Sequence, residues 1–195
     1  MAATEAKRQA NRWPALLDVA AARFAEQGYH ATTIRELAAA TAMTPGAIYF
    51  HVPNKQALLL AVYEEGVQRI VEHVEKAIAG HVTAWDRLNA AVEAHLEAIL
   101  DASAYARVVI RILPDDVPEI AADLTRLRDR YEECFRVMFA QVRLMDGLAP
   151  GLARLFVLGA LNWTPVWHRP GGGTPIAEIA RQLLAPLRAA GERTP

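Results

Sequence analysis

A hydroxyl, an imidazole and an ammonium group follow one another closely in one short part of this sequence. Tyr49, His51 and Lys55 lie within about three helical turns of Thr44, an N-cap residue that is followed by Pro45 at the first helical position. Donors of these kinds are typical of side chains that hold a protein on the phosphate backbone of nucleic acid. The small residues at the start of this segment leave it open to a close approach. The spacing therefore predicts a helix that enters the major groove of double-stranded DNA.

A second short helix is marked directly before this one. Thr33 and Glu36 have the spacing of a capping box, in which each side chain satisfies a backbone donor at the other position. The following helix is expected to end near His51, because Pro53 cannot continue it. Two short helices joined by a tight turn form a helix-turn-helix motif.

The apolar residues of the whole chain recur with the helical period, and the alternation that marks strands is absent. We therefore predict an all-α fold of about nine helices, with an N-terminal helix-turn-helix domain at 1–54 and a larger C-terminal domain at 55–195 that binds ligand and dimerises. Eight helices are expected at about 7–27, 33–40, 45–51, 55–79, 83–101, 103–113, 118–147 and 150–168, and the seventh should be the longest. A final helix should begin at Thr174 and be weakened by Pro186.

Composition excludes several other classes of protein. The chain has 195 residues, 53% hydrophobic and 22% charged, which is enough for a sizeable core and excludes wholesale disorder. No apolar run reaches the ~20 residues of a membrane span, and no secretory signal is visible, so a cytoplasmic location is expected. The single cysteine, Cys134, excludes an internal disulfide and a Cys-based zinc site. Neither a metal nor a cofactor is expected.

Charge is distributed slightly unevenly along the chain. Its formal net charge is −1, but residues 1–60 hold six basic and four acidic side chains. The first third is therefore the part best suited to a polyanion, although a solvated helix face often carries such an imbalance.

Residues 16–62 resemble the DNA-binding domain of the tetracycline-repressor (TetR) family. The positions that carry the resemblance fall in register without gaps and are Phe24, Gly28, Tyr29, Thr32, Thr33, Tyr49, His51, Asn54, Lys55 and Leu58.

The family implies a role for each matching position. Thr33 would bind phosphate at the start of its helix, and Thr44, Gly46 and Ala47 would face bases. Tyr49 and His51 would contact phosphate or sugar, and Lys55 would anchor a phosphate. Pro45 completes the predicted DNA-binding set; its position varies within the family, so the operator sequence does not transfer.

A second resemblance lies in residues 159–172, Gly-Ala-Leu-Asn-Trp-Thr-Pro-Val-Trp-His-Arg-Pro-Gly-Gly. It is similar to the end of the dimer helix in TetR-type regulators of fatty-acid and steroid breakdown, although His168 stands where such proteins often have tyrosine. The resemblance implies a homodimeric repressor of lipid catabolism. A small hydrophobic ligand, such as an acyl-CoA thioester, would release it from a palindromic operator.

The apolar stripe from Ile120 to Met145 indicates an ordinary core for most of its members, and a few of them are candidates to line a ligand pocket. Aromatic, sulfur and flexible apolar groups adapt to ligands, and Tyr131, Cys134, Phe135 and Met138 supply them. His95 joins this set, although a satisfied core histidine is the simpler interpretation. Arg107 and Arg111 lie four residues apart and suit either an anionic ligand group or ion pairs with acids. Trp163 and Trp167 complete the set.

The helix expected at 150–168 is apolar nearly all round, which indicates either a buried monomer helix or a dimer interface. We favour the interface, with the last two helices of each chain forming a four-helix bundle, because this motif reads two half-sites. Small residues on the helix would allow a close approach. The predicted interface residues are Leu152, Leu155, Phe156, Gly159, Ala160 and Trp163.

Two other functions compete with a DNA-binding regulator. A helical enzyme could use the same apolar pocket, but Ser103 is the only serine and no nucleophile elbow or metal-ligand spacing occurs, so no catalytic residue is predicted. A helical interaction module that never touches DNA would pack residues 44–55 on a partner. Salt-dependent binding to duplex DNA separates that module from a regulator.

Overall fold

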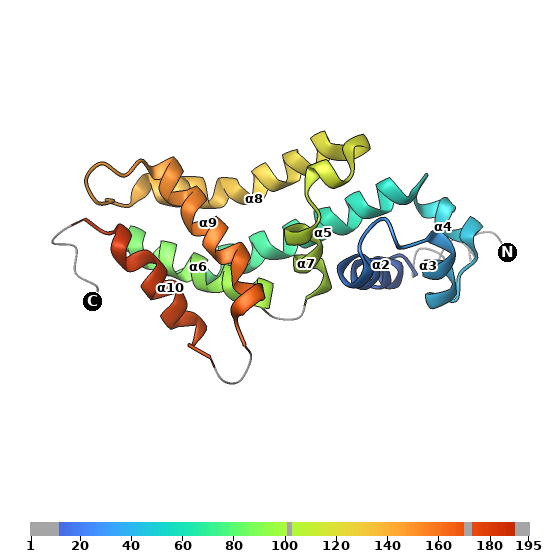
Figure 1. Cartoon of the computed structure of the whole chain (residues 1–195), viewed down its shortest axis with the longest axis horizontal. Helices are drawn as coiled ribbons and strands as arrows, with labels where there is room; N and C mark the ends of the chain where they lie inside the picture. The colour runs from blue at the N-terminus through green and yellow to red at the C-terminus, as the bar shows by residue number, and fades with distance from the viewer. Residues whose placement is uncertain (1–11, 101–102, 170–172, 190–195) are drawn as a thin grey trace. The chain divides into compact units, whose positions relative to one another are not determined.

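The computed structural model describes residues 12–100, 103–169 and 173–189 (Figure 1). These residues form nine α-helices and no strand, so the all-α prediction is confirmed. The predicted start of the first helix, at Lys7, lies outside the described residues. The helices are α2 (Trp13–Gln27), α3 (Ile34–Ala40), α4 (Pro45–His51), α5 (Lys55–Ile78), α6 (Ala84–Leu100), α7 (Ala104–Arg111), α8 (Ala121–Gln141), α9 (Pro150–Trp167) and α10 (Ile176–Leu184), with 3-10 turns η1 (Pro114–Asp116), η2 (Pro118–Ile120) and η3 (Ala185–Leu187).

The chain divides into two compact units. The first contains α2, α3, α4, the start of α5 up to Gln68, and the segment Ala104–Arg128. The second contains the rest of α5, α6, the larger part of α8, α9 and α10. No helix in the described part of the chain is long and apolar enough to cross a membrane.

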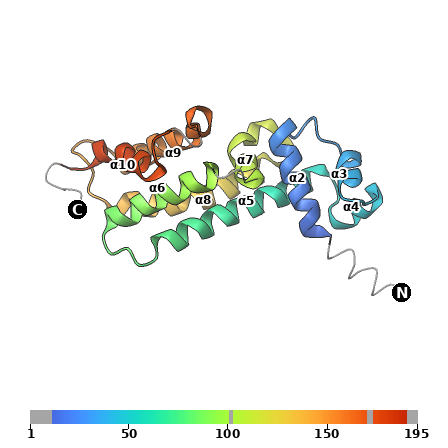
Figure 2. The same cartoon turned by 90° about the horizontal axis from the view of Figure 1, so that it is seen from below.

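Helix α2 forms the centre of the first unit. It begins with Pro14 in its first turn and ends at Gly28, whose φ of +85° favours glycine. Phe24 and three other apolar side chains of one face, Leu16, Leu17 and Ala20, are buried. Helix α7 packs beside α2, as both cartoon views show (Figures 1 and 2).

Three polar contacts hold the segment from α7 to η1 against α2 and the turn after it. The Tyr105 hydroxyl donates a hydrogen bond of 2.8 Å to Asp18 Oδ1. Arg111 reaches the carbonyl oxygen of Ala25 at 3.5 Å, and His30 Nε2 lies 2.9 Å from the carbonyl oxygen of Asp116. Helix α2 and the turn after it are therefore held in part by residues that are distant from them in the sequence.

Helices α5 and α7 come unusually close at Gly66. A Cβ atom at this glycine would lie 2.7 Å from Val109 Cγ2 and 3.0 Å from the carbonyl oxygen of Tyr105. Beside this point the buried Tyr63 hydroxyl donates to the carbonyl oxygen of Val109 at 3.0 Å, and Arg128 donates to the same oxygen at 3.2 Å. The approach needs a residue without a side chain.

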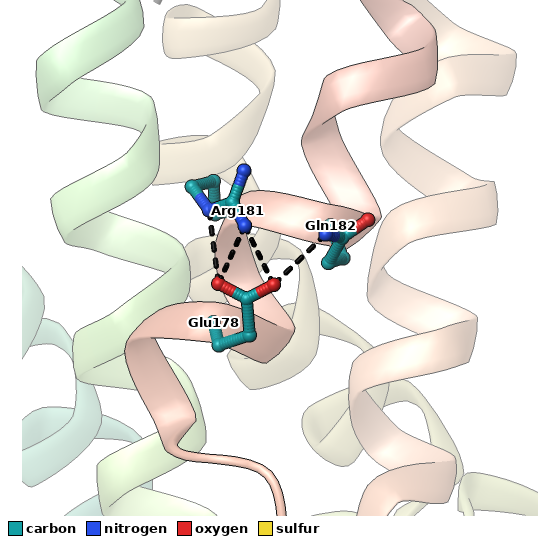
Figure 3. A network of polar contacts seen from close by, with 3 residues as sticks. All are labelled: Glu178, Arg181 and Gln182. Atoms are coloured by element: carbon teal, nitrogen blue, oxygen red, sulfur yellow. Dashed lines mark hydrogen bonds and ion pairs between the residues drawn. The ribbon is translucent and has the colours of Figure 1, made fainter.

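The second unit has an apolar core between α6, α9 and α10, and both α9 and α10 pack on α6. The polar side of α10 is internally paired. Arg181 donates to both carboxylate oxygens of Glu178, at 3.0 Å from Nε and 2.6 Å from NH2, and Gln182 donates at 2.8 Å (Figure 3). These bonds from Arg181 lower the pKa of Glu178. Helix α10 buries Ala180 and Leu184 on its other side.

The prediction that the longest helix runs to Gly147 is wrong. Helix α8 ends at Gln141 and has 21 residues, whereas α5 has 24. Beyond α8 the backbone pairs with the end of the chain, because Leu144 forms an isolated antiparallel bridge with Arg188 and the Met145 amide donates to the Leu187 carbonyl at 2.9 Å. This tertiary pairing overrides the helical period of the sequence.

Candidate DNA-binding surface, ligand site and dimer surface

The first short helix, α3, has the capping box that its sequence predicts. Thr33 Oγ1 accepts a hydrogen bond of 3.2 Å from the Glu36 amide, and the Thr33 amide donates one of 2.8 Å to Glu36 Oε2. These bonds from Thr33 lower the pKa of Glu36. Ala42, with a φ of +51°, turns the chain sharply between α3 and α4.

Helix α4, which the sequence predicts to enter the major groove, is capped by Thr44, whose Oγ1 accepts from the Ala47 amide at 3.1 Å. Its inner side buries Ile48 and partly buries Ala47 and His51. The His51 ring stacks on Trp13 of α2, with 5.4 Å between the ring centroids. The exposed side, called here the outer face of α4, consists of Pro45, Gly46, Tyr49 and Phe50.

Lys55 has structural partners at the start of α5. Its Nζ donates to the carbonyl oxygens of Tyr29 and Thr32, each at 2.9 Å, and lies 4.2 Å from the centroid of the Tyr29 ring. Partial burial lowers the pKa of Lys55. Lys55 thus holds the turn before α3 on α5.

The eight predicted DNA-binding residues fall into two groups. Ala47, His51 and Lys55 are partly buried and support the motif from inside. The predicted set does not include Phe50, which also lies on the outer face, four residues after Gly46. Contact with DNA stays a prediction for all eight residues. The exposed group consists of Thr33, Thr44, Pro45, Gly46 and Tyr49.

Three of the predicted ligand-pocket residues meet in the core of the second unit. His95 is fully buried; its Nδ1 lies 2.7 Å from the Tyr131 hydroxyl and its Nε2 lies 3.1 Å from Asn162 Oδ1. Its ring stacks on Tyr131 at 5.5 Å and meets the edge of Phe135 at 5.8 Å. A neutral imidazole fits both partners, since Nε2–H donates to Asn162 and Nδ1 accepts from Tyr131. Burial lowers the pKa of His95 to about 4.

The other predicted pocket residues are not joined to this cluster by the contacts described. Met138 is buried, and Cys134 is half-buried, with its pKa raised by burial. Arg107 and Arg111 belong to the first unit. Asn162 was not predicted to belong to this cluster, because the sequence does not indicate which residue a single polar side chain in an apolar helix will contact. Trp163 and Trp167 are exposed on α9. In the described part of the chain no group of three or more His, Cys, Asp or Glu side chains could hold a metal.

Acid is expected to destabilise the protein through His95. The pKa of about 4 in the folded state lies below the ~6.5 of an unfolded histidine, so the unfolded state binds more protons between these values. The contribution of His95 to the free energy of unfolding is therefore complete above about pH 6.5 and is lost as the pH falls toward 4. Lowering the pH from 7 to 5 should reduce the free energy of unfolding by about 2 kcal/mol through this residue.

Urea unfolding at pH 7 and pH 5 measures this loss in the wild type and in His95→Gln. The variant should lose about 2 kcal/mol less than the wild type between the two pH values. His81→Gln, at an exposed histidine, is the matched control and should behave as the wild type does. An equal loss in His95→Gln and in the wild type would show that other groups cause the acid sensitivity.

Helix α9 presents an apolar surface on its outer side. It buries Ala153, Val157, Leu158, Leu161 and Thr164 toward its own unit. The opposite side exposes large apolar side chains, each by 48% to 65%. A continuous exposed surface of this kind is typical of an interface, whereas the outer side of α10 is polar. We define this α9 surface as Leu152, Leu155, Phe156, Trp163, Val166 and Trp167, with Gly159 and the half-buried Ala160 between them.

Two family models match the chain. The model for "Bacterial regulatory proteins, tetR family" matches residues 16–62, and the model for "Tetracyclin repressor-like, C-terminal domain" matches residues 81–189, more than half of the chain. The transcriptional repressor KstR2 of Rhodococcus jostii is 29% identical, over 94% of this chain and 92% of its own length.

Solved structures share the fold over nearly the whole chain. The structure of AibR in complex with isovaleryl coenzyme A and operator DNA has a TM-score of 0.77 at 24% identity, over 90% of this chain and 99% of that one. The TetR-family regulator PfmR of Thermus thermophilus has a TM-score of 0.70 at 28% identity, over 91% of this chain and 99% of that one.

Proposed function

Because the chain belongs to the tetracycline-repressor (TetR) family, we propose that it is a homodimeric repressor that a small hydrophobic ligand releases from a palindromic operator. Members of this family are DNA-binding transcriptional regulators, not enzymes. The ligand in our proposal is an acyl-CoA thioester, and the regulated process is lipid catabolism. A regulator that binds operator DNA acts where the DNA is, so we also propose a cytoplasmic location.

The outer face of α4 is the observation that carries this proposal. Helices α3 and α4 are both capped, and they are held in place by Lys55 and by the stack of His51 on Trp13. The outer face of α4 is exposed, so it is free to enter the major groove of DNA. We propose 1–54 as the DNA-binding domain, with Thr44, Pro45, Gly46 and Ala47 near base edges. Thr33, Tyr49, His51 and Lys55 would contact the phosphate backbone.

The homodimer is supported by the apolar surface of α9. Two copies related by a two-fold axis would cover this surface with its own counterpart. A palindromic operator also requires two helix-turn-helix domains, because their recognition helices must enter major grooves about 34–36 Å apart. We therefore propose 55–195 as the domain that dimerises and binds ligand. The exposure of Trp163 and Trp167 favours the interface over the pocket for both.

The names of the relatives support the direction of regulation and the ligand. KstR2 is described as a repressor, and AibR binds isovaleryl coenzyme A and operator DNA. A ligand in the second unit would favour a different spacing of the two helix-turn-helix domains in the dimer. Helix α5 is suited to transmit this change, because it belongs to both units. Coupling of this kind is typically worth ~1–3 kcal/mol.

Mobility shift with purified protein and fragments of genomic upstream DNA tests the proposal. Specific retention is expected, and micromolar isovaleryl-CoA or a longer acyl-CoA should relieve it. Retention that no acyl-CoA changes would reject this inducer class but leave the DNA-binding regulator in place. Absence of specific retention would reject the regulator itself.

Tyr49 separates direct contact from support of the fold. Tyr49→Ala should weaken operator binding by about tenfold, the loss typical of one good contact. Tyr49→Phe keeps the ring and loses the hydroxyl, so it reports whether the hydroxyl makes the contact. Circular dichroism should show an unchanged melting temperature for both variants, since the side chain is exposed. Full binding by Tyr49→Ala would remove Tyr49 from the interface.

A further inference from the structure

The outer face of α4 lacks the side chains that usually read base edges by hydrogen bonds. Arginine, lysine, asparagine and glutamine form the bidentate contacts that distinguish base pairs in the major groove. Helix α4 has the sequence Pro-Gly-Ala-Ile-Tyr-Phe-His and contains none of them. Its outer face offers one hydroxyl, that of Tyr49, and otherwise apolar or missing side chains. Base recognition by this face must therefore depend mainly on apolar contact.

Phe50 is the most exposed large side chain of this face. Its exposed fraction is 69%, against 51% for Tyr49. The ring is supported from behind, because it meets His51 edge-on at 5.8 Å and His51 in turn stacks on Trp13 at 5.4 Å. This series of aromatic rings restricts the orientation of Phe50 before DNA binds. A rigid apolar ring turned to solvent gains free energy when a partner covers it.

Gly46 leaves room beside this ring. It precedes Phe50 by one helical turn, and a Cβ atom at Gly46 would have a single neighbour, the Thr44 hydroxyl oxygen at 3.9 Å. The space is open, so the absence of a side chain is not required by packing within the chain. It does allow a base pair to approach the Phe50 ring without obstruction.

We propose that Phe50 reads the C5-methyl group of thymine in each half-site of the operator. This inference rests on the proposed function and adds the chemistry by which one base is chosen. The thymine methyl is the apolar group that base pairs present in the major groove, and phenylalanine is among the side chains that contact it. The operator is thus recognised at this position by burial of a methyl group instead of by a hydrogen bond.

The test uses full-length protein and an operator obtained by selection from random duplex DNA. Each thymine in the selected half-site is replaced by deoxyuridine, which removes the methyl group and keeps every hydrogen bond. At the position read by Phe50, affinity measured by fluorescence anisotropy should fall about fourfold for one half-site and about 15-fold for both. At the same position, 5-methylcytosine should bind more tightly than cytosine, because it restores the methyl group.

Variants at Phe50 assign the effect to this residue. Phe50→Ala should bind the thymine operator more weakly and lose less than twofold on replacement by deoxyuridine. Phe50→Leu keeps an apolar side chain and should retain part of the discrimination. Leu113→Ala, at an exposed apolar residue outside α4, is the matched control and should discriminate as the wild type does.

Two results would overturn the inference while the proposed function stands. Wild-type protein that binds the deoxyuridine operator as tightly as the thymine operator would show that no methyl group is read. An unchanged deoxyuridine effect in Phe50→Ala would assign the methyl contact to another residue, such as Pro45. A selection that enriches no sequence would instead reject the proposed function, and the inference with it.

Discussion

Replacement of Phe156 by glutamate should turn the proposed dimer into a monomer and weaken operator binding by about 100-fold or more. Phe156 lies in the middle of the apolar surface of α9 and is exposed in the single chain. In a two-fold interface each copy contributes the residue once, so the substitution would bury two unpaired carboxylates. Covering such charges costs more than a single hydrophobic contact supplies. One monomer reads one half-site, which explains the size of the loss in DNA binding.

Analytical ultracentrifugation and fluorescence anisotropy measure the two parts of this prediction. Val82→Glu introduces the same charge at another exposed apolar residue and should leave both the dimer and operator binding unchanged. A Phe156→Glu protein that stays dimeric and binds operator as the wild type does would place the interface elsewhere than on α9.

A side chain larger than that of alanine at Gly66 is expected to cause a large loss of stability. A Cβ atom there would lie 2.7 Å from Val109 Cγ2 and 3.0 Å from the Tyr105 carbonyl oxygen. Valine is stiff and the carbonyl belongs to the backbone, so neither can move away easily. Alanine would gain ~1 kcal/mol of helix propensity but lose ~1–3 kcal/mol through overpacking. Gly66→Val should therefore destabilise the first unit by about 3 kcal/mol or more.

Urea unfolding of Gly66→Val at a fixed protein concentration measures this loss. Gly151→Ala is the control within a helix, since nothing lies within 4 Å of the added Cβ atom, and it should be neutral or slightly stabilising. The double variant Gly66→Ala with Val109→Ala should be more stable than the sum of the single changes predicts. Wild-type stability in Gly66→Val would show that α5 and α7 separate easily.

The local features of the helix-turn-helix could be predicted from sequence because they depend on neighbouring residues. Thr33 and Glu36 are three apart, Thr44 precedes Pro45, and Gly28 follows the apolar stripe of α2. Capping and left-handed termination act over a single turn, so these patterns reveal their structure directly. The other helices of the all-α fold could be predicted from the helical period of the apolar residues.

Features that depend on distant residues could not be predicted. The end of α8 is set by pairing of Leu144 with Arg188, and the role of Lys55 depends on carbonyl groups about 25 residues earlier. The sequence places His95 among apolar neighbours, but only the fold brings Asn162 and Tyr131 to its two nitrogens. Exposure of one side of α9 likewise depends on which side the other helices cover.

The contacts between α2 and the segment from α7 to η1 limit how this protein can be recombined. Tyr105, Arg111 and Asp116 come from the C-terminal part of the sequence, yet they complete the packing and hydrogen bonding of the N-terminal helix and its following turn. A gene fusion joined at residue 55 would give α2 a foreign α7 that lacks these partners. Under the proposed function, substitutions in α4 can change the preferred operator without disturbing these contacts, but an exchange of the C-terminal domain must bring a compatible α2 with it.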